Sequence, residues 1–379
     1  MSASNSEPGE FDQIPVIDLS ALRSPVLKER QRLAKKIFTA CTQVGFFYIK
    51  NHEIAEDLIA SLHDMARQFF TLSQKQKMDY YIGRSRKFRG FMPLYSEQPT
   101  DTDLGAAPKA DPTSPGAFSE SFDIGYEDAA DPLKSQHGDG PLDTYDLYGD
   151  NQWPEEDVLP GFREVYLRYF AEALTLSRAL IRIFALALDL PEDFFDTMIK
   201  NPGATSRMLH YPPQPVADEV RVGLGEHTDY ECFTILSQDQ VPALQVLNAR
   251  QEWILAPPIP GTLVVNISDC LSIWTNKKFK STIHRVTNLT GQERYTVPFF
   301  FGVDYDTTVA VLPSCITEDN PACKKPFKAG EWVRHQLTTA YVGYEPEPPT
   351  QGNPNHCAGT KRGNIAWGFQ PNLYRTLTM

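Results

Sequence analysis

The stretch that decides the fold contains three short motifs: His227-Thr-Asp229, His284-Arg-Val286 and Arg294-Tyr-Thr296. Apolar and β-branched residues, which favour strands, follow the first motif and surround the last. On a strand, side chains at positions i and i+2 point to the same face, so His227 and Asp229 should project together. His284 must come from another strand. Two imidazoles and one carboxylate on one face of a metal leave the other positions open, an arrangement typical of non-haem Fe(II) sites.

The last motif repeats this spacing with different chemistry. The Arg294 guanidinium offers two parallel N–H donors to a carboxylate, and the Thr296 hydroxyl on the same face adds a third hydrogen bond. Tyr211, shortly before the first motif, can supply another hydroxyl to the far end of the same ligand. Each motif alone would indicate little in a chain with 8 histidines, but their conjunction predicts an iron site beside a socket for an acid.

With these motifs the chain resembles the isopenicillin N synthase-like family of 2-oxoglutarate- and Fe(II)-dependent oxygenases, from about Ile14 to about Tyr341. Further matching stretches support the resemblance: Ile14–Leu19, Gly45–His52, Arg89–Phe91, Trp153–Gly161, Tyr211–Pro212, Asn266–Asp269, Trp274–Asn276 and Ser281–Val286. The resemblance implies iron ligation by His227, Asp229 and His284. It also implies that Arg294 and Thr296 clamp the distal carboxylate of 2-oxoglutarate.

Two positions depart from the family pattern. Thr296 stands where the family usually has serine, which keeps the hydroxyl. Leu209 stands where plant members usually have asparagine, so the resemblance supports Tyr211 less directly than Arg294.

The resemblance implies Fe(II) as cofactor and 2-oxoglutarate and O2 as co-substrates, and it allows ascorbate as a reductant. The implied reaction oxidises an unactivated C–H bond of a small molecule, by hydroxylation, desaturation or ring formation, in secondary-metabolite biosynthesis. Asp229 argues against a halogenase, because halide would need the position that the carboxylate occupies.

Other functions remain as alternatives. Arg294 and Thr296 by themselves indicate only a carboxylate ligand, so the main alternative is a 2-oxoglutarate-independent Fe(II) oxidase of the isopenicillin N synthase or ethylene-forming type. A non-catalytic small-molecule-binding relative is a weaker alternative, because no iron ligand is lost. The Gly-x-Ser-x-Gly and His-Glu-x-x-His motifs of hydrolases are absent from the sequence.

Short strand-like segments separated by Pro, Gly and Asn turns dominate the chain from Arg207 to Leu312. This spacing predicts a β-sandwich or barrel, and with the motifs in place it predicts a double-stranded β-helix, or jelly roll, with the metal in one open end. Apolar residues at helical spacing over Phe162–Leu188 predict a long helix that backs the sheet. We therefore expect a mainly β fold with flanking helices and a helical N-terminal part.

The motifs belong to one continuous pattern, so we expect residues 1–379 to form a single catalytic domain. Within it, residues of about 14–160 should form the helical N-terminal region, about 205–312 the jelly-roll core, and 313–379 a C-terminal helix and tail. The stretch Ser96–Trp153 is rich in Pro, Gly and Asp. We expect a lid around Gln98–Phe118 within it, and a solvated surface insertion is the alternative.

Candidates for the substrate pocket are mostly aromatic, which suits a small, largely apolar molecule: Arg89, Phe91, Tyr95, Tyr230, Phe233 and Phe301. The net charge of −12 argues against a nucleic-acid partner. No apolar run approaches the ~20 residues that cross a bilayer, and the N-terminal residues do not resemble a secretory signal. The 6 cysteines lack zinc or redox spacing. We therefore expect a cytoplasmic monomer with no membrane partner.

Overall fold

The computed structural model describes residues 9–97, 116–137, 143–214 and 221–341. By its contacts the chain divides into two compact units, Met1–Pro346 and Glu347–Met379, and all described residues belong to the first. Of the expected lid around Gln98–Phe118, only the last three residues are described. The tail after Tyr341 also lies outside the described residues.

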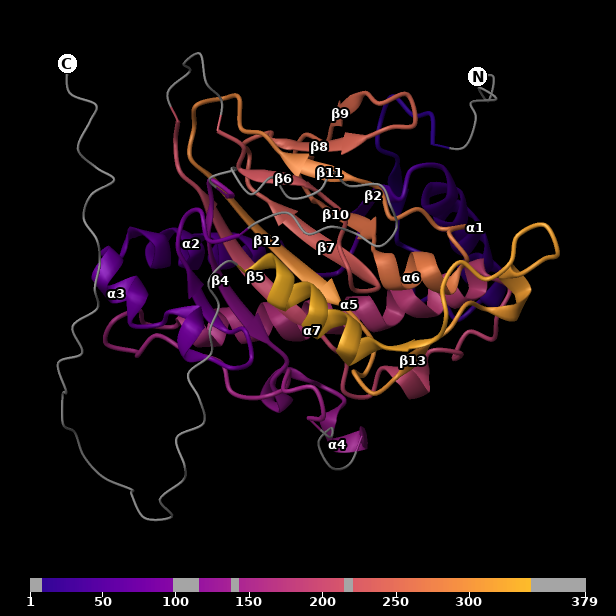
Figure 1. Ribbon diagram of the computed structural model, residues 1–379, viewed down its shortest axis with the longest axis horizontal. Helices are drawn as coiled ribbons and strands as arrows, with labels where there is room; N and C mark the ends of the chain where they lie inside the picture. The colour runs from indigo at the N-terminus through magenta and orange to yellow at the C-terminus, as the bar shows by residue number, and fades with distance from the viewer. Residues whose placement is uncertain (1–8, 98–115, 138–142, 215–220, 342–379) are drawn as a thin grey trace. The chain divides into compact units, whose positions relative to one another are not determined.

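Two β-sheets form the centre of the described unit (Figure 1). The larger sheet has the order β1-β2-β10-β7-β12-β5-β4-β3. Its strands are β1 Val16–Asp18, β2 Phe46–Lys50, β3 Gly90–Met92, β4 Glu120–Gly125, β5 Thr205–Tyr211, β7 Phe233–Gln238, β10 Thr262–Ile267 and β12 Arg294–Phe301. The smaller sheet has the order β6-β11-β8-β9 and contains β6 Leu224–His227, β8 Leu244–Leu247, β9 Trp253–Leu255 and β11 His284–Val286. A separate pair joins β13 Thr308–Val309 and β14 Phe327–Lys328. The predicted jelly-roll core is confirmed.

Alternation along the strands gives the larger sheet one face toward the helices and one toward the smaller sheet. In β2, Phe47 and Ile49 join the large core beneath the helices. Phe46 and Tyr48 instead join a second apolar cluster that includes residues of β8. Burying an aromatic side chain stabilises a fold by about 1.5–3 kcal/mol, so a one-residue slip of β2 would exchange both sets at a large cost.

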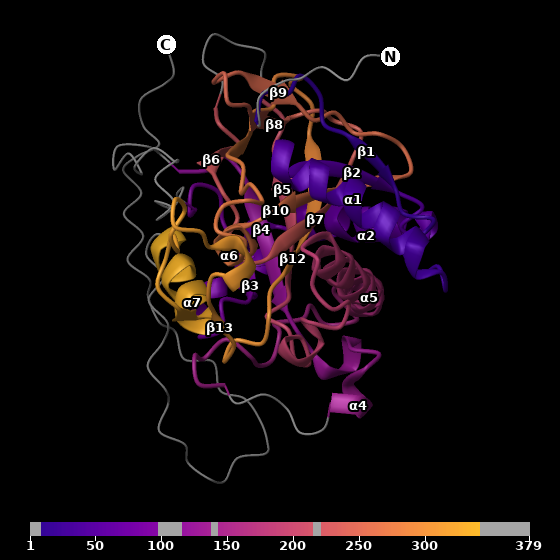
Figure 2. The ribbon, with the colours of Figure 1, turned by 90° about the vertical axis from the view of Figure 1, so that its right-hand side faces the viewer.

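Helices cover the outer face of the larger sheet (Figure 2). These helices are α1 Leu27–Gln43, α2 Glu56–Thr71 and α5 Phe162–Ala187. The predicted backing helix is confirmed as α5, which contacts α1, α2 and β12. Its side chain Phe170 packs edge-on against Phe299 of β12, with ring centroids 4.9 Å apart. Gly161 precedes the helix at φ 73°, a left-handed conformation that glycine adopts without strain.

The remaining helices are shorter: α3 Gln74–Met78, α4 Lys134–His137, α6 Asp269–Trp274 and α7 Ala329–Ala340. Within the described ranges, no helix combines the length and apolarity that a membrane crossing requires. The cysteines of these ranges are free thiols, which agrees with their spacing in the sequence.

Candidate active site

A cavity of about 950 Å³, part of it open to solvent, lies against both sheets and the end of α7. The cavity wall is largely apolar, with contributions from Phe46, Leu209, Leu224, Leu236, Leu244, Val286, Pro298, Phe300, Leu337 and Ala340. The same cavity is lined by polar side chains of the first motif, His227 and Asp229, and of the third, Arg294 and Thr296.

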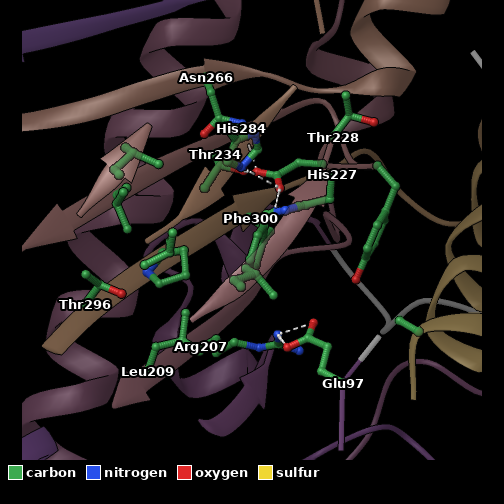
Figure 3. A pocket seen from close by; sticks show the side chains of 18 of the residues that line it. Glu97, Arg207, Leu209, His227, Thr228, Thr234, Asn266, His284, Thr296 and Phe300 are labelled. Carbon is green, nitrogen blue, oxygen red and sulfur yellow. Dashed lines mark hydrogen bonds and ion pairs between the residues drawn. The ribbon is translucent and has the colours of Figure 1, made fainter. Parts of the chain in front are cut away.

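His227, Asp229 and His284 form a compact cluster of donor atoms at this cavity. Strands β6 and β11 pair in a register that sets His227 directly opposite His284, and their ring centroids are 4.2 Å apart. The Nε2 atoms of both histidines lie 3.6 Å from Oδ1 of Asp229. Figure 3 shows the two imidazoles side by side, one from each strand.

Backbone carbonyls orient both imidazoles. The Nδ1 atom of His227 lies 2.7 Å from the carbonyl oxygen of Gly225, and that of His284 lies 3.2 Å from the oxygen of Thr282. Nδ1 therefore carries the proton and donates, which leaves the lone pair of Nε2 directed at the cluster. Burial, together with the neighbouring His227, lowers the pKa of His284 to about 4, so its ring is in the neutral form that binds metals.

Asp229 is held through its other oxygen. Asn266 of β10 donates to Oδ2 at 2.8 Å, and the hydroxyl of Thr234 on β7 donates to the same atom. Burial tends to raise the pKa of this carboxyl, but the two histidines and these hydrogen bonds outweigh burial and keep it below its ordinary value. The carboxylate is thus ionised, and Oδ1 is directed at the two Nε2 atoms.

The expected strand geometry holds for His227 but not for Asp229. Strand β6 ends at His227, so Asp229 lies in the turn that follows and not two positions along a strand. The turn is fixed from α6, because the backbone N–H of Asp269 donates to the carbonyl oxygen of Asp229 at 2.8 Å. The hydroxyl of Thr228 also donates to the Asp269 carboxylate, at 3.2 Å. The predicted residues still converge, but the turn brings Asp229 to the histidines.

This donor set fits Fe(II). Two neutral imidazole nitrogens and one carboxylate oxygen all lie within 4.8 Å of one another, and each ligand is oriented by a second hydrogen bond. Among the described residues, no other group of three His, Cys, Asp or Glu side chains meets this criterion.

Arg294 lies in the same cavity with one nitrogen unused. Arg294 is only 1% exposed. Its Nε donates to the carbonyl oxygen of Val241 at 3.1 Å, and its second terminal nitrogen donates to Oε1 of Gln238 at 3.0 Å. The first terminal nitrogen, Nη1, has no hydrogen-bond partner in the described part of the chain. A buried guanidinium with a free donor fits an anionic ligand such as a carboxylate.

Thr296 and Tyr211 complete this end of the cavity. Arg294 pairs with Tyr211 across β12 and β5, and Thr296 pairs with Leu209. The guanidinium carbon of Arg294 lies 4.9 Å from the centre of the Tyr211 ring. Burial raises the pKa of Tyr211, so its hydroxyl stays protonated. All three residues predicted for 2-oxoglutarate therefore line one region of the cavity.

The structure separates the substrate-pocket candidates. Tyr230 lines the cavity. Phe233 and Phe301 lie on the correct strands but point to the opposite face, where both are fully buried in the core beneath the helices. Their neighbours Thr234 and Phe300 occupy the cavity face instead.

The other candidates lie elsewhere. Phe91 is fully buried in the helix-facing core. Arg89 is 3% exposed and donates to the carbonyl oxygens of Phe88 and Leu147, so it holds a loop and does not line the cavity. Tyr95 packs against Phe118, with ring centroids 5.6 Å apart, and is also outside the cavity lining.

The sequence prediction missed several cavity residues. Asn266 and Thr234 position Asp229, and Gln238 positions Arg294, but polar residues inside strands carry no local signal of such roles. Glu97, Arg207 and Tyr341 form a polar end of the cavity, and they come from distant parts of the chain. Periodicity could have found Pro298 and Phe300, because both share their strand face with Arg294 and Thr296.

Comparisons with known proteins agree with this geometry. A family model described as the N-terminal region of a non-haem dioxygenase in morphine synthesis matches residues 14–156. A second model, the 2OG-Fe(II) oxygenase superfamily, matches residues 202–303. The 2-oxoglutarate-Fe(II) type oxidoreductase ppzC of Metarhizium rileyi is 35% identical over 335 residues, which cover 86% of this chain and 87% of the relative.

Solved structures show the same relationship. A full-length Neurospora crassa protein, solved in complex with alpha-KG, is 27% identical, with a TM-score of 0.72, over 86% of this chain and 95% of that protein. JOX2 in complex with 2OG, Fe and JA is also 27% identical, with a TM-score of 0.67, over 88% of this chain and 86% of that protein.

Proposed function

Since this chain belongs to the 2-oxoglutarate- and Fe(II)-dependent oxygenases, we propose that it oxidises an unactivated C–H bond of a small, largely apolar molecule in secondary metabolism. We assign iron binding to His227, Asp229 and His284, and binding of the distal carboxylate of 2-oxoglutarate to Arg294 with Thr296. The observation that carries the proposal is that one largely apolar cavity contains both polar sets. The substrate class and its metabolic role rest on that lining and on the family resemblance.

Fe(II), 2-oxoglutarate and O2 supply the oxidising power for C–H cleavage when they are bound. The protein residues orient and enclose the reactants. The fixed tautomers of His227 and His284 present lone pairs without rearrangement, and Asn266 and Thr234 hold Asp229 in its ligating position. Such preorganisation reduces the entropy lost in reaching a reactive geometry.

The unused donor of Arg294 supports 2-oxoglutarate as the acid in this socket. Gln238 and Val241 hold the guanidinium with its free nitrogen in the cavity, on the same strand face as the Thr296 hydroxyl. The relatives reported above carry 2-oxoglutarate in their names or in their complexes. We therefore do not adopt the 2-oxoglutarate-independent oxidase that the sequence left open.

The test is an anaerobic absorption titration of the apo-protein with Fe(II) and then with 2-oxoglutarate. We expect a visible metal-to-ligand charge-transfer band that appears only with 2-oxoglutarate and needs a far higher concentration in Arg294→Ala. Substrate-dependent succinate formation with terpenoid, alkaloid and polyketide acceptors then tests the substrate class. Fe(II) binding without the band would contradict the assigned clamp, and stimulation by amino acids or nucleobases alone would contradict the substrate class.

The proposal also covers oligomeric state, location, partners and domain organisation. We propose that the chain acts as a monomer in the cytoplasm and has no nucleic-acid or membrane partner; the net charge of −12 supports the exclusion of nucleic acid. We also propose that the whole chain forms one catalytic domain. Light scattering of the purified protein tests the oligomeric state.

A further inference from the structure

The polar end of the cavity is an ion-pair network formed by Glu97, Arg207, Asp123 and Tyr341. Figure 3 shows Glu97 and Arg207 paired on the other side of Phe300 from the two histidines. Glu97, Arg207 and Tyr341 line the cavity, whereas Asp123 lies behind Arg207, because β4 and β5 pair with Asp123 opposite Arg207. Glu97 also forms an isolated antiparallel bridge with Tyr341, which follows α7.

Each nitrogen of Arg207 already has a partner. Its Nε donates to Oδ1 of Asp123 at 2.5 Å, and Nη1 donates to both carboxylate oxygens of Glu97 at 2.8 and 2.9 Å. Nη2 donates to the hydroxyl of Tyr341. The Arg207 side chain is only 9% exposed. A substrate carboxylate could bind Arg207 only by displacing Glu97. It would then lie close to the carboxylates of Glu97 and Asp123, which would repel it.

Glu97, in contrast, retains accepting capacity. Both of its oxygens face the same nitrogen of Arg207, so each keeps a lone pair for another donor. Its side chain is 16% exposed, and it lines the cavity. Glu97 is therefore the member of the network that a ligand in the cavity can reach.

The charges of the network do not cancel. Two carboxyl groups, Glu97 and Asp123, face one guanidinium, Arg207. Burial raises the pKa of Asp123, and the charge of Arg207 opposes this effect. With both carboxyl groups ionised, the sum of −2 and +1 leaves one negative charge. The two carboxylates raise the pKa of Arg207 against the opposing effect of its burial, so the guanidinium is charged. This end of the cavity therefore has a negative charge that no described side chain of the network balances.

With Fe(II) and 2-oxoglutarate bound, the charges of these two groups and of the residues proposed to hold them would sum to zero. The charge of Fe(II) is +2, Asp229 contributes −1, the 2-oxoglutarate dianion −2 and Arg294 +1. The negative charge at Glu97 therefore makes the remaining space of the cavity favour a positively charged group. The rings of Tyr230, Phe300 and Tyr341 line this space, and aromatic rings also attract cations.

We propose that Glu97 is the polar anchor for the substrate and that the substrate is an apolar molecule with a basic nitrogen, bound as a protonated amine. This inference rests on the proposed function, because it assigns the substrate class of the same cavity. The ammonium group would donate to the free lone pairs of Glu97, and the apolar body would lie along the wall toward the iron site.

The test compares probes that share one scaffold and carry a positive, a neutral or a negative end group. For phenyl, indolyl and cyclohexyl scaffolds, a butylamine, its N-acetyl derivative and the pentanoate of similar length would be titrated against the Fe(II)- and 2-oxoglutarate-loaded protein by anaerobic calorimetry at low salt. We expect the amine to bind about tenfold more tightly than its N-acetyl derivative on at least one scaffold. Glu97→Gln should remove this preference, and Glu97→Asp should retain part of it.

Glu127→Gln is the matched control. Glu127 is also a poorly exposed carboxylate paired with an arginine, Arg163, but it lies outside the cavity. This variant should keep the amine preference. Equal affinity for all three probe charges, tighter binding of the acids, failure of every amine to bind, or an undiminished preference in Glu97→Gln would each overturn the proposal. The charge-transfer band of the native protein with 2-oxoglutarate is recorded on the same samples. If the band appears, these outcomes contradict the amine proposal alone. If it does not appear, the proposed function itself has failed.

Discussion

Replacing Arg294 by methionine should separate ligand affinity from protein stability. The residue is 1% exposed, and burying a charge costs several kcal/mol. Its hydrogen bonds to Val241 and Gln238 offset this cost, because hydrogen bonds to charged groups contribute about 1.5–3 kcal/mol each. Its remaining nitrogen has no partner among the described residues. The opposing terms nearly cancel, so the free energy of unfolding of the apo-protein should change by no more than about 1 kcal/mol.

The affinity for 2-oxoglutarate should respond very differently. Removal of Arg294 leaves the distal carboxylate without its charged partner, and breaking a buried ion pair in this way costs about 3–5 kcal/mol. At about 1.4 kcal/mol per factor of ten, the Kd should rise by at least about 100-fold.

Two measurements on one set of samples check both parts. The charge-transfer titration gives the Kd for 2-oxoglutarate, and urea unfolding without ligand gives the stability. Arg182→Met, which removes one charge from the exposed side of α5, is a control that should leave the Kd unchanged. A Kd for Arg294→Met within threefold of the native value would refute the clamp. A loss of more than about 3 kcal/mol of stability would refute the energy balance.

Four further variants test other parts of the structure. Asn266→Ala removes the hydrogen bond to Asp229, so the Kd for Fe(II) in an anaerobic titration should rise about 10–100-fold; an unchanged Kd would exclude a positioning role. Phe301→Ala, in the core, should lower the free energy of unfolding in urea by about 3–5 kcal/mol, and Phe300→Ala, on the cavity face, by less than half as much; equal losses would contradict the strand register. Burial lowers the pKa of His63 from 6.5 to about 4, so only the unfolded chain binds this proton between those values. Stability should therefore fall by up to about 3 kcal/mol as the pH is lowered from about 6.5 to about 4, and His63→Gln should reduce that slope in urea titrations; a native slope in the variant would argue against this assignment.

Strand β12 shows how far simple periodicity reaches. The rule that joined Arg294 to Thr296 continues to Pro298 and Phe300, and all four residues line the cavity. The same rule assigns Phe301 to the core, where the structure places it. The choice of Phe301 as a pocket residue followed its aromatic character and not its position along the strand. Position along the strand was therefore more informative than aromatic character, and it could be read from the sequence.

The convergence of the residues that we propose as iron ligands was predictable for a different reason. Two histidines and an aspartate carry distinctive chemistry, so the set could be recognised without knowing how the chain brings them together. The local geometry was not predictable in the same way, because Asp229 lies beyond the end of β6 in a turn that Asp269 fixes from α6. That contact joins residues 40 positions apart, and strand periodicity contains no information about it.

The polar end of the cavity illustrates a limit of local patterns. Arg207 meets Glu97 across 110 positions of sequence and Tyr341 across 134. Each of these residues, taken alone, reads as an ordinary polar residue of a strand, loop or helix end, because a local pattern cannot say which carboxylate will face which guanidinium. Only the pairing of β4 with β5 places Asp123 opposite Arg207, so that Glu97 becomes the second carboxylate on a guanidinium that already has one. The sign of this excess charge is a property of the assembled sheet, and it is the feature from which a substrate class can be inferred.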